Sequence, residues 1–210
     1  MKTLLYIHGM GGGADSRIPN SLKWLFDPEK ELRIIIRTYD FDPEAGREQI
    51  RQWVEEVKPD LVVGESLGAA QALRVQGVPH LFVSPSLGGP LQLYRWAPVT
   101  LFALGRWFLH RRFPVKEGDR QPLKFRYKVM RKYKAHWEAA VAAIDPKGYY
   151  FAFFGKYDHY KQSGVVSVER WIELFGKDSY AEYPGSHFME PDFIESLLVP
   201  KIREILALEK

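Results

Sequence analysis

The segment Gly64-Glu65-Ser66-Leu67-Gly68 limits the possible fold more than any other part of this chain. It follows an apolar run at residues 61–63 and precedes residues 69–73, whose side chains are typical of a helix. The two glycines permit the sharp turn that presents a serine above the end of a strand. A turn without chemistry would have a similar composition, but the flanking strand and helix favour a nucleophile at Ser66.

Short apolar runs rich in strand-forming residues alternate along the chain with stretches of helical periodicity. This order predicts one α/β domain over residues 1–210, a three-layer α/β/α sandwich with about six mostly parallel strands. The expected strands cover residues 3–7, 32–38, 61–64, 81–84, 149–154 and 179–183. The expected helices cover residues 43–57, 66–75, 165–175 and 191–207. The first of these helices has the clearest start, with Asp42 as its cap and Pro43 in its first turn.

Residues 88–147 interrupt the alternation and are expected to form a mostly helical cap insertion. Within them one helix face is formed by side chains four residues apart, namely Phe125, Val129, Tyr133 and Trp137. Residues 91–137 contain twelve Lys or Arg and only two acidic residues, so they carry +10 in a chain whose net charge is +4. The sequence therefore predicts a basic surface on an otherwise mildly acidic body.

A serine hydroxyl needs a base to remove its proton and an acid to orient that base. His187 follows the last expected strand, at the sheet edge expected for Ser66, and is the predicted base. His159 is the main rival because it neighbours the acid candidate, but no later acid lies at an equivalent strand end to orient it. The other histidines have less suitable places: His8 is expected to brace the loop after the first strand, His80 precedes a strand, and His110 and His136 lie in the insertion.

Asp158 is the predicted acid, because it lies just past the expected strand at residues 149–154. Its position gives the chain order serine, acid, histidine that is typical of α/β-hydrolases. The alternative is that Asp158 only caps the helix that follows. Asp145 and Asp178 precede strands and are less suitable. Some related enzymes place the acid one strand earlier, but the sequence there is Ser84-Pro85-Ser86, without a carboxylate.

The loop His8-Gly9-Met10-Gly11-Gly12-Gly13 follows the first expected strand. Attack on a carbonyl creates an oxyanion that needs preorganised donors, and the backbone N–H groups of Met10 and Leu67 are the expected pair. Gly9, Gly11 and Glu65 are the expected substrate-binding residues around them. A glycine-rich loop can also cradle a phosphate, but this loop matches neither of the common phosphate-binding patterns.

The chain resembles the α/β-hydrolase superfamily, and more narrowly the small YqiA-like bacterial esterases. The resemblance covers nearly the whole length and is carried by residues 3–9, residues 63–68, Ser84-Pro85-Ser86 and residues 185–187. It implies hydrolysis of carboxylic esters or thioesters through an acyl-enzyme, without a metal or an organic cofactor. Two features depart from the family pattern: Glu65 beside the nucleophile, and an insertion that is more basic and aromatic than expected.

Several roles for the insertion remain open. Its cations could bind an acidic leaving group, such as the phosphates of an acyl-coenzyme A. Its aromatic and basic side chains could instead rest on an anionic membrane, through Trp96, Arg106, Trp107, Phe108, Arg111, Arg112 and Phe113. Nucleic acid is not an expected partner because no binding motif is present. The simplest alternative is an apolar face on the body with solvated charges outside.

Cysteine is absent, and no apolar run approaches the ~20 residues that cross a bilayer. The apolar residues at positions 1–10 are too few for a signal peptide and are interpreted as a strand. We therefore expect a cytoplasmic enzyme. Two alternatives to hydrolysis are transfer of the acyl group to an acceptor other than water, and non-catalytic binding on the same fold. The sequence indicates nothing about oligomeric state.

Overall fold

A computed structural model describes residues 1–26, 31–114 and 117–208 of the chain. Over these ranges six strands form one sheet in the order β2-β1-β3-β4-β5-β6, and every neighbouring pair is parallel. The strands are β1 (Lys2–Ile7), β2 (Leu32–Ile36), β3 (Leu61–Glu65), β4 (His80–Val83), β5 (Tyr150–Gly155) and β6 (Tyr180–Tyr183). The predicted fold class, a three-layer α/β/α sandwich with six parallel strands, is confirmed.

The strand order places a change of direction between β1 and β3. The chain passes from β1 outward to β2 and then returns to the other side of β1 for β3. Connections that leave the carboxyl ends of β1 and β3 therefore diverge, and ligands of open α/β sheets bind at such a point. The glycine-rich loop follows β1 and Ser66 follows β3, so both predicted parts of the site lie there.

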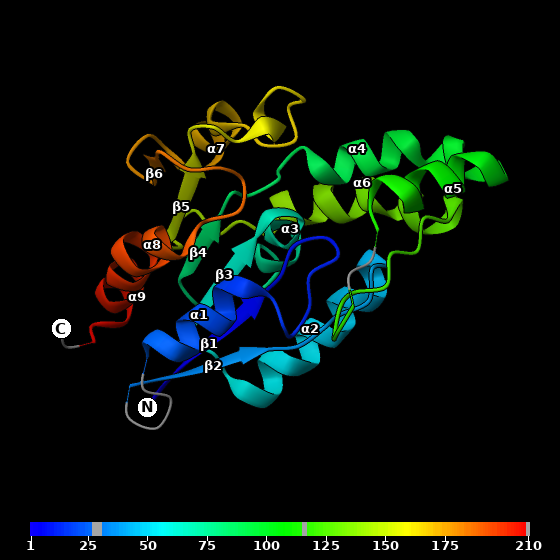
Figure 1. Cartoon of the computed structure of the whole chain (residues 1–210). Coiled ribbons are helices and arrows are strands. Elements are labelled where there is room, and N and C mark those ends of the chain that lie inside the picture. Colours follow the sequence, from blue (N-terminus) through cyan, green and yellow to red (C-terminus); the bar gives the residue numbers. More distant parts are fainter. Residues whose placement is uncertain (27–30, 115–116, 209–210) are drawn as a thin grey trace.

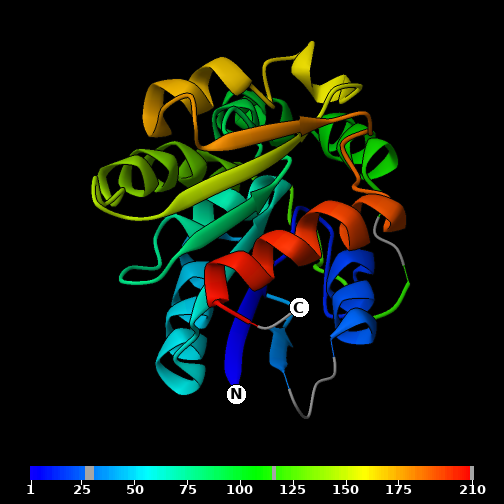
Figure 2. The same ribbon diagram turned by 90° about the vertical axis from the view of Figure 1, so that its left-hand side faces the viewer.

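Helices cover both faces of the sheet (Figure 2). One face packs against α1 (Arg17–Leu25), α8 (Pro191–Phe193) and α9 (Val199–Leu206). The other packs against α2 (Pro43–Val57), α3 (Ala69–Ala72), α7 (Val168–Phe175) and the later part of α6 (Tyr127–Ala142). The central strands are apolar on both sides because both faces are covered.

Local sequence signals explain where several helices begin. Asp42 Oδ1 accepts a hydrogen bond from the N–H of Glu44 at 3.1 Å, so the predicted cap of α2 is confirmed. The helix expected at residues 165–175 begins at Val168, because the Ser167 hydroxyl accepts from the N–H of Arg170 and caps it there. Helix α1 was not among the predicted elements.

Two predicted helices differ in detail from those observed. The helix expected at residues 66–75 is a 3-10 turn, η1 (Ser66–Gly68), followed by the single short helix α3. The helix expected at residues 191–207 contains a π-helical segment, η4 (Ile194–Leu198), between α8 and α9. Pro200 has no N–H to donate within a regular helix, and the N–H of Val199 instead reaches the Ile194 carbonyl.

The insertion, meaning here the helices between β4 and β5, consists of α4 (Gly89–Trp96), the 3-10 helix η2 (Ala97–Leu101), α5 (Ala103–Arg112) and α6. Figure 1 shows α4 and α6 side by side, with α5 at the end of the molecule farthest from β5 and β6. The four side chains expected on one helix face are all buried, although Phe125 lies just before α6 begins.

A separate apolar cluster holds the insertion on the body, and it includes Leu67, Leu93, Leu109 and Phe125. Ion pairs reinforce this contact. In each pair a basic residue of the insertion segment meets an acidic residue of the body, as in Lys124–Asp40, Lys132–Asp42 and Arg120–Asp15. Part of the charge asymmetry seen in the sequence therefore serves to attach the insertion.

None of the helices within the described ranges is both long enough and apolar enough to cross a membrane.

Candidate active site

Ser66 occupies the turn between β3 and η1 in a backbone conformation that is rare for a residue with a side chain. Its φ is +50°, in the left-handed region. Neither flanking position has room for a side chain. A Cβ at Gly64 would lie 2.8 Å from the Cβ of Ala72, and one at Gly68 would lie 2.4 Å from the His8 carbonyl oxygen. The side chain of Ser66 therefore stands at the carboxyl edge of the sheet on a tightly packed turn.

The two other predicted catalytic side chains meet Ser66 at this edge. His187 Nε2 lies 2.9 Å from the Ser66 hydroxyl oxygen, and His187 Nδ1 lies 2.7 Å from Asp158 Oδ2. Asp158 follows β5 and His187 follows β6, so three connections distant in sequence converge. Both Asp158 and His187 are only 3% exposed, whereas Ser66 is half-buried.

The contacts of His187 define its tautomer. A carboxylate can only accept hydrogen bonds, so Nδ1 carries the hydrogen that faces Asp158. In the neutral imidazole Nε2 is then a lone-pair acceptor, and the Ser66 hydroxyl donates to it. Tyr160 packs edge-on against the imidazole, with ring centroids 4.6 Å apart. The ring is thus oriented as a base toward Ser66.

Asp158 both contacts His187 and caps the helix that follows it. One carboxylate oxygen faces His187, and the other accepts a hydrogen bond from the N–H of Tyr160 at 2.8 Å. That second bond caps the short helix η3 (His159–Lys161). Capping therefore fixes the carboxylate that orients the imidazole.

The loop that carries His187 is anchored by a residue that was not predicted. The Arg17 guanidinium donates a hydrogen bond to the carbonyl of Met189 at 2.7 Å. Arg17 begins α1, the helix absent from the predicted elements. The spacing of Ile18 and Leu22 after Ser16 is a helical signal that would have revealed it.

The two amides expected to bind an oxyanion are free of protein acceptors. Within the described ranges neither the N–H of Met10 nor that of Leu67 donates a hydrogen bond. Gly9 lies directly against the nucleophile, because a Cβ there would meet the Ser66 Cβ at 2.9 Å. The glycine-rich loop after β1 therefore lies close to the turn at Ser66, and the N–H groups of Met10 and Leu67 are available there as donors.

His8 braces this loop. Its Nδ1 lies 2.8 Å from the Gly9 carbonyl oxygen, and its ring stacks on Tyr39 with centroids 4.3 Å apart. The Tyr39 hydroxyl donates to the His8 carbonyl at 2.7 Å. Burial lowers the pKa of His8 to about 4, so the ring is neutral near pH 7. A neutral ring in this place fits a structural role.

Gln121 of the insertion segment is a second residue that sequence reasoning missed. Its Oε1 accepts from the N–H of Gly11 at 3.2 Å, and its Nε2 donates to the Tyr39 carbonyl at 3.1 Å. Its own N–H donates to the Gly12 carbonyl at 2.7 Å. Gln121 is 1% exposed. The insertion thus fixes the shape of the glycine-rich loop. No local sequence motif predicts this role for Gln121.

The three expected substrate-binding residues have different surroundings. Gly9 faces Ser66, and Gly11 has a φ of +70° and lies near Leu123. Glu65 is engaged within the protein, since its Oε2 accepts a hydrogen bond from the Tyr6 hydroxyl at 2.8 Å. Burial, followed by the negative charge of Glu65, raises the pKa of Tyr6 well above its usual value.

Among the described residues, no histidine other than His187 and no acid forms a hydrogen bond with the Ser66 side chain. His159 is exposed on η3, with its ring centroid 6.3 Å from that of His187. His80 begins β4 at the opposite edge of the sheet. Asp145 Oδ1 accepts from the N–H of Lys147 ahead of β5. In the part of the chain that the structure describes, no cluster of three or more His, Cys, Asp or Glu is arranged to hold a metal ion.

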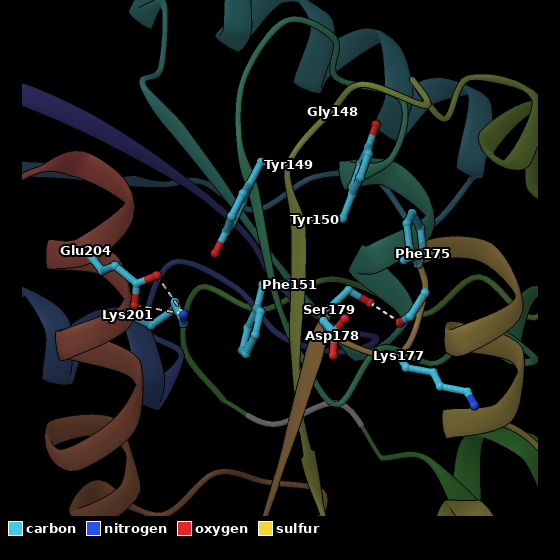
Figure 3. A pocket seen from close by; sticks show the side chains of 11 residues that line it. Gly148, Tyr149, Tyr150, Phe151, Phe175, Lys177, Asp178, Ser179, Lys201 and Glu204 are labelled. Atoms are coloured by element: carbon cyan, nitrogen blue, oxygen red, sulfur yellow. Dashed lines mark hydrogen bonds and ion pairs between the residues drawn. The ribbon is translucent and has the colours of Figure 1, made fainter.

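A cavity of about 460 Å³ lies at the amino ends of β5 and β6 (Figure 3). It is lined by tyrosine and phenylalanine side chains of β5 and by Lys201 and Glu204 of α9, which are paired with each other. Asp158 and His187 follow the carboxyl ends of the same two strands. The cavity is therefore at the opposite edge of the sheet and is not part of the candidate active site.

Comparison with known proteins establishes the fold class. No protein-family model matches the chain, and no curated protein matches its sequence. Solved structures do match. A putative hydrolase from Agrobacterium vitis S4 has a TM-score of 0.66 and 16% identity, over 97% of this chain and 87% of that one. Fluorophosphonate-binding serine hydrolase F of Staphylococcus aureus has a TM-score of 0.61 and 12% identity, over 98% and 84%.

A third similar structure comes from work on carboxylesterases of the thaumarchaeon Nitrososphaera gargenis. It has a TM-score of 0.58 and 13% identity, over 98% of this chain and 91% of that one. At such identities the similarity establishes the fold and not the reaction. The chain has a compact α/β-hydrolase fold.

Proposed function

We propose that this protein is a serine hydrolase that cleaves a carboxylic ester or thioester through an acyl-enzyme. The observation that carries the proposal is the continuous line of contacts from Ser66 through His187 to Asp158, at 2.9 and 2.7 Å. The names of the similar structures, which include a serine hydrolase and carboxylesterases, support the same reaction class. The finer resemblance to YqiA-like esterases is part of this proposal and rests on the sequence.

In the proposed mechanism, the Ser66 oxygen attacks the carbonyl carbon while its proton passes to His187 Nε2. Asp158 stabilises the imidazolium that forms and keeps the ring in place. The N–H groups of Met10 and Leu67 bind the oxyanion of the tetrahedral intermediate. The imidazolium then gives its proton to the leaving alcohol or thiol, and the acyl group stays on Ser66. Water, deprotonated by His187, releases the acid and restores the hydroxyl.

Labelling with a fluorophosphonate probe tests this proposal. The probe phosphonylates a serine only when a neighbouring base activates it, so the wild-type chain should be labelled at Ser66 and Ser66→Ala should not be. Ser196→Ala is the matched control: it removes a hydroxyl that donates one hydrogen bond on η4, without contact to Ser66, and should leave Ser66 labelled at the wild-type rate. Absence of labelling in the wild type would favour a non-catalytic binding protein, and labelling at another serine would refute the assignment.

A further inference from the structure

The insertion exposes a group of large apolar side chains that the proposed reaction does not use. Six residues of η2, α5 and the junction between them are each at least 46% exposed. They are Val99, Leu101, Phe102, Leu104, Trp107 and Phe108, and we call them the α5 patch. Within α5 only Leu109 is buried. The helix is therefore apolar on sides that face away from the core, and exposed apolar groups of this kind mark an interaction surface.

Positive charge surrounds the α5 patch without negative charge to balance it. No Asp or Glu occurs between Glu65 and Glu117 in the sequence. Arg95, Arg111 and Arg112 are exposed, and in the described ranges no carboxylate forms an ion pair with them. The cations of the insertion segment therefore form two groups. Lys124, Lys132 and Arg120 pair with acidic residues of the body, whereas the arginines named above do not. The arginines near α5 are available to an external anion.

Two of these arginines lie over aromatic rings. The Arg111 guanidinium is 5.6 Å from the centroid of the Trp107 ring, and the Arg112 guanidinium is 5.1 Å from that of Phe113. Cations and aromatic side chains therefore share one surface. This combination is typical of helices that lie in a membrane interface, with apolar side chains among the acyl chains and cations at the phosphates.

We propose that the α5 patch docks on the surface of an anionic lipid bilayer. A second copy of the chain fits less well, because a symmetric contact through this patch would bring two sets of unpaired arginines together. Nucleic acid also fits less well, because half of the patch is aliphatic (Val99, Leu101 and Leu104) and these side chains cannot stack on bases. Only a partner with negative charge outside and an apolar interior matches both features of the patch.

Docking in this way would also orient the candidate active site. Leu109 of α5 and Leu67, the residue after Ser66, belong to one buried cluster. The insertion that carries the α5 patch thus packs on the same side of the molecule as the nucleophile. If the proposed hydrolase activity holds, an ester presented at the membrane interface is the class of substrate that docking favours. Membrane binding itself does not depend on that activity.

Sedimentation of the full chain with vesicles tests the proposal. Vesicles of phosphatidylcholine with about a third of phosphatidylglycerol should retain the wild type, and vesicles of phosphatidylcholine alone should retain at least about tenfold less. Retention should fall with added salt. Trp107→Ser combined with Phe108→Ser, and separately Arg111→Gln combined with Arg112→Gln, should each weaken binding about tenfold or more.

Two matched controls keep the test specific. Trp24→Ser removes an exposed tryptophan of α1, and Lys147→Gln with Lys177→Gln removes two exposed cations near the opposite edge of the sheet. Both should bind vesicles like the wild type. All variants should keep the wild-type melting temperature and fluorophosphonate labelling in solution, so that a failure of docking is distinct from a failure of the proposed reaction.

Three outcomes would overturn the proposal: no retention on anionic vesicles, retention that the α5 variants leave unchanged, or equal loss in the control variants. A further outcome would replace it. This outcome is a wild-type dimer, detected by light scattering after size exclusion, that Trp107→Ser combined with Phe108→Ser converts to a monomer. The α5 patch would then be a contact between copies of the chain.

Discussion

The hydroxyl oxygens of Ser66 and Ser86 lie 3.0 Å apart. Because the hydrogen of Ser66 is directed to His187 Nε2, the hydrogen of this second bond comes from Ser86. Ser86 is 4% exposed and follows β4, while its N–H donates to the Ser66 carbonyl at 3.0 Å. A donor aimed at the Ser66 oxygen stabilises the negative charge that develops there as the proton leaves.

We therefore expect Ser86→Ala to lower kcat about tenfold, with little change in KM. The rate of fluorophosphonate labelling at Ser66 should fall in parallel, while the free energy of unfolding changes by about 1 kcal/mol or less. Ser196→Ala is the control, since Ser196 also donates one hydrogen bond but lies on the distant helix η4. An unchanged kcat in Ser86→Ala would contradict this role.

Gln121 provides a test of how the insertion shapes the glycine-rich loop. Gln121→Leu preserves bulk but leaves the N–H of Gly11 and the Tyr39 carbonyl without their partner. We expect a loss of about 2 kcal/mol in the free energy of unfolding and a fall of about tenfold in kcat, because the Met10 amide loses its support. Urea unfolding and steady-state kinetics measure the two effects.

The exposed Gln52, which donates to Glu48 on α2, offers a control for this substitution. Gln52→Leu should leave kcat unchanged. Equal kcat values for Gln121→Leu and the wild type would show that the glycine-rich loop holds its shape without the insertion.

The turn at Ser66 predicts a contrast between two glycines. A Cβ at Gly68 would lie 2.4 and 2.5 Å from the carbonyl oxygens of His8 and Ile7. These are backbone atoms of β1 and its loop and cannot move cheaply, so Gly68→Ala should cost on the order of 3 kcal/mol or more. Gly164 has a φ of +69° but open space around it. Gly164→Ala should cost only about 1 kcal/mol, from the left-handed conformation alone.

Thermal and urea unfolding of the two glycine variants measure this difference. Similar losses in both would mean that backbone conformation, and not the close approach of β1 to the turn, explains why glycine follows Leu67.

The local sequence pattern was sufficient to predict the strands of the sheet and the edge at which three candidate side chains lie. Each of Ser66, Asp158 and His187 follows a predicted strand within a few residues, and parallel strands bring such positions to one edge. The structure places these residues in contact, and their catalytic roles remain a proposal. Pattern could not reveal Gln121, because its partners Gly11 and Tyr39 are 110 and 82 residues away in the sequence.

The insertion shows a second limit of sequence reasoning. The apolar spacing of Val129, Tyr133 and Trp137 correctly identified the buried face of α6. Helix α5 has no such single face, because apolar residues occur all around it, so its sequence does not show which side chains are buried. Only the packing of Leu109 against the cluster at Leu67 separates the buried side from the α5 patch.

Three buried histidines predict how stability depends on pH. Burial lowers the pKa of His8, His80 and His136 to about 4 each, against about 6.5 in an unfolded chain. Between these two values the unfolded state takes up protons that the folded state does not, so stability is full above about pH 6.5 and falls as the pH drops toward 4. A single histidine contributes at most about 3 kcal/mol to this loss.

His136→Leu isolates one of these contributions. His136 lies on α6 with its Nε2 buried and without a hydrogen-bond partner in the described ranges, and after burial the charges of Arg74 and Arg47 also lower its pKa. The variant should lose less unfolding free energy than the wild type between about pH 7 and about pH 5. His159→Gln, at an exposed histidine, should lose as much as the wild type. If His136→Leu instead shows the wild-type loss, the His136 ring must accept a proton within the folded protein, which its burial and the charges of Arg74 and Arg47 disfavour.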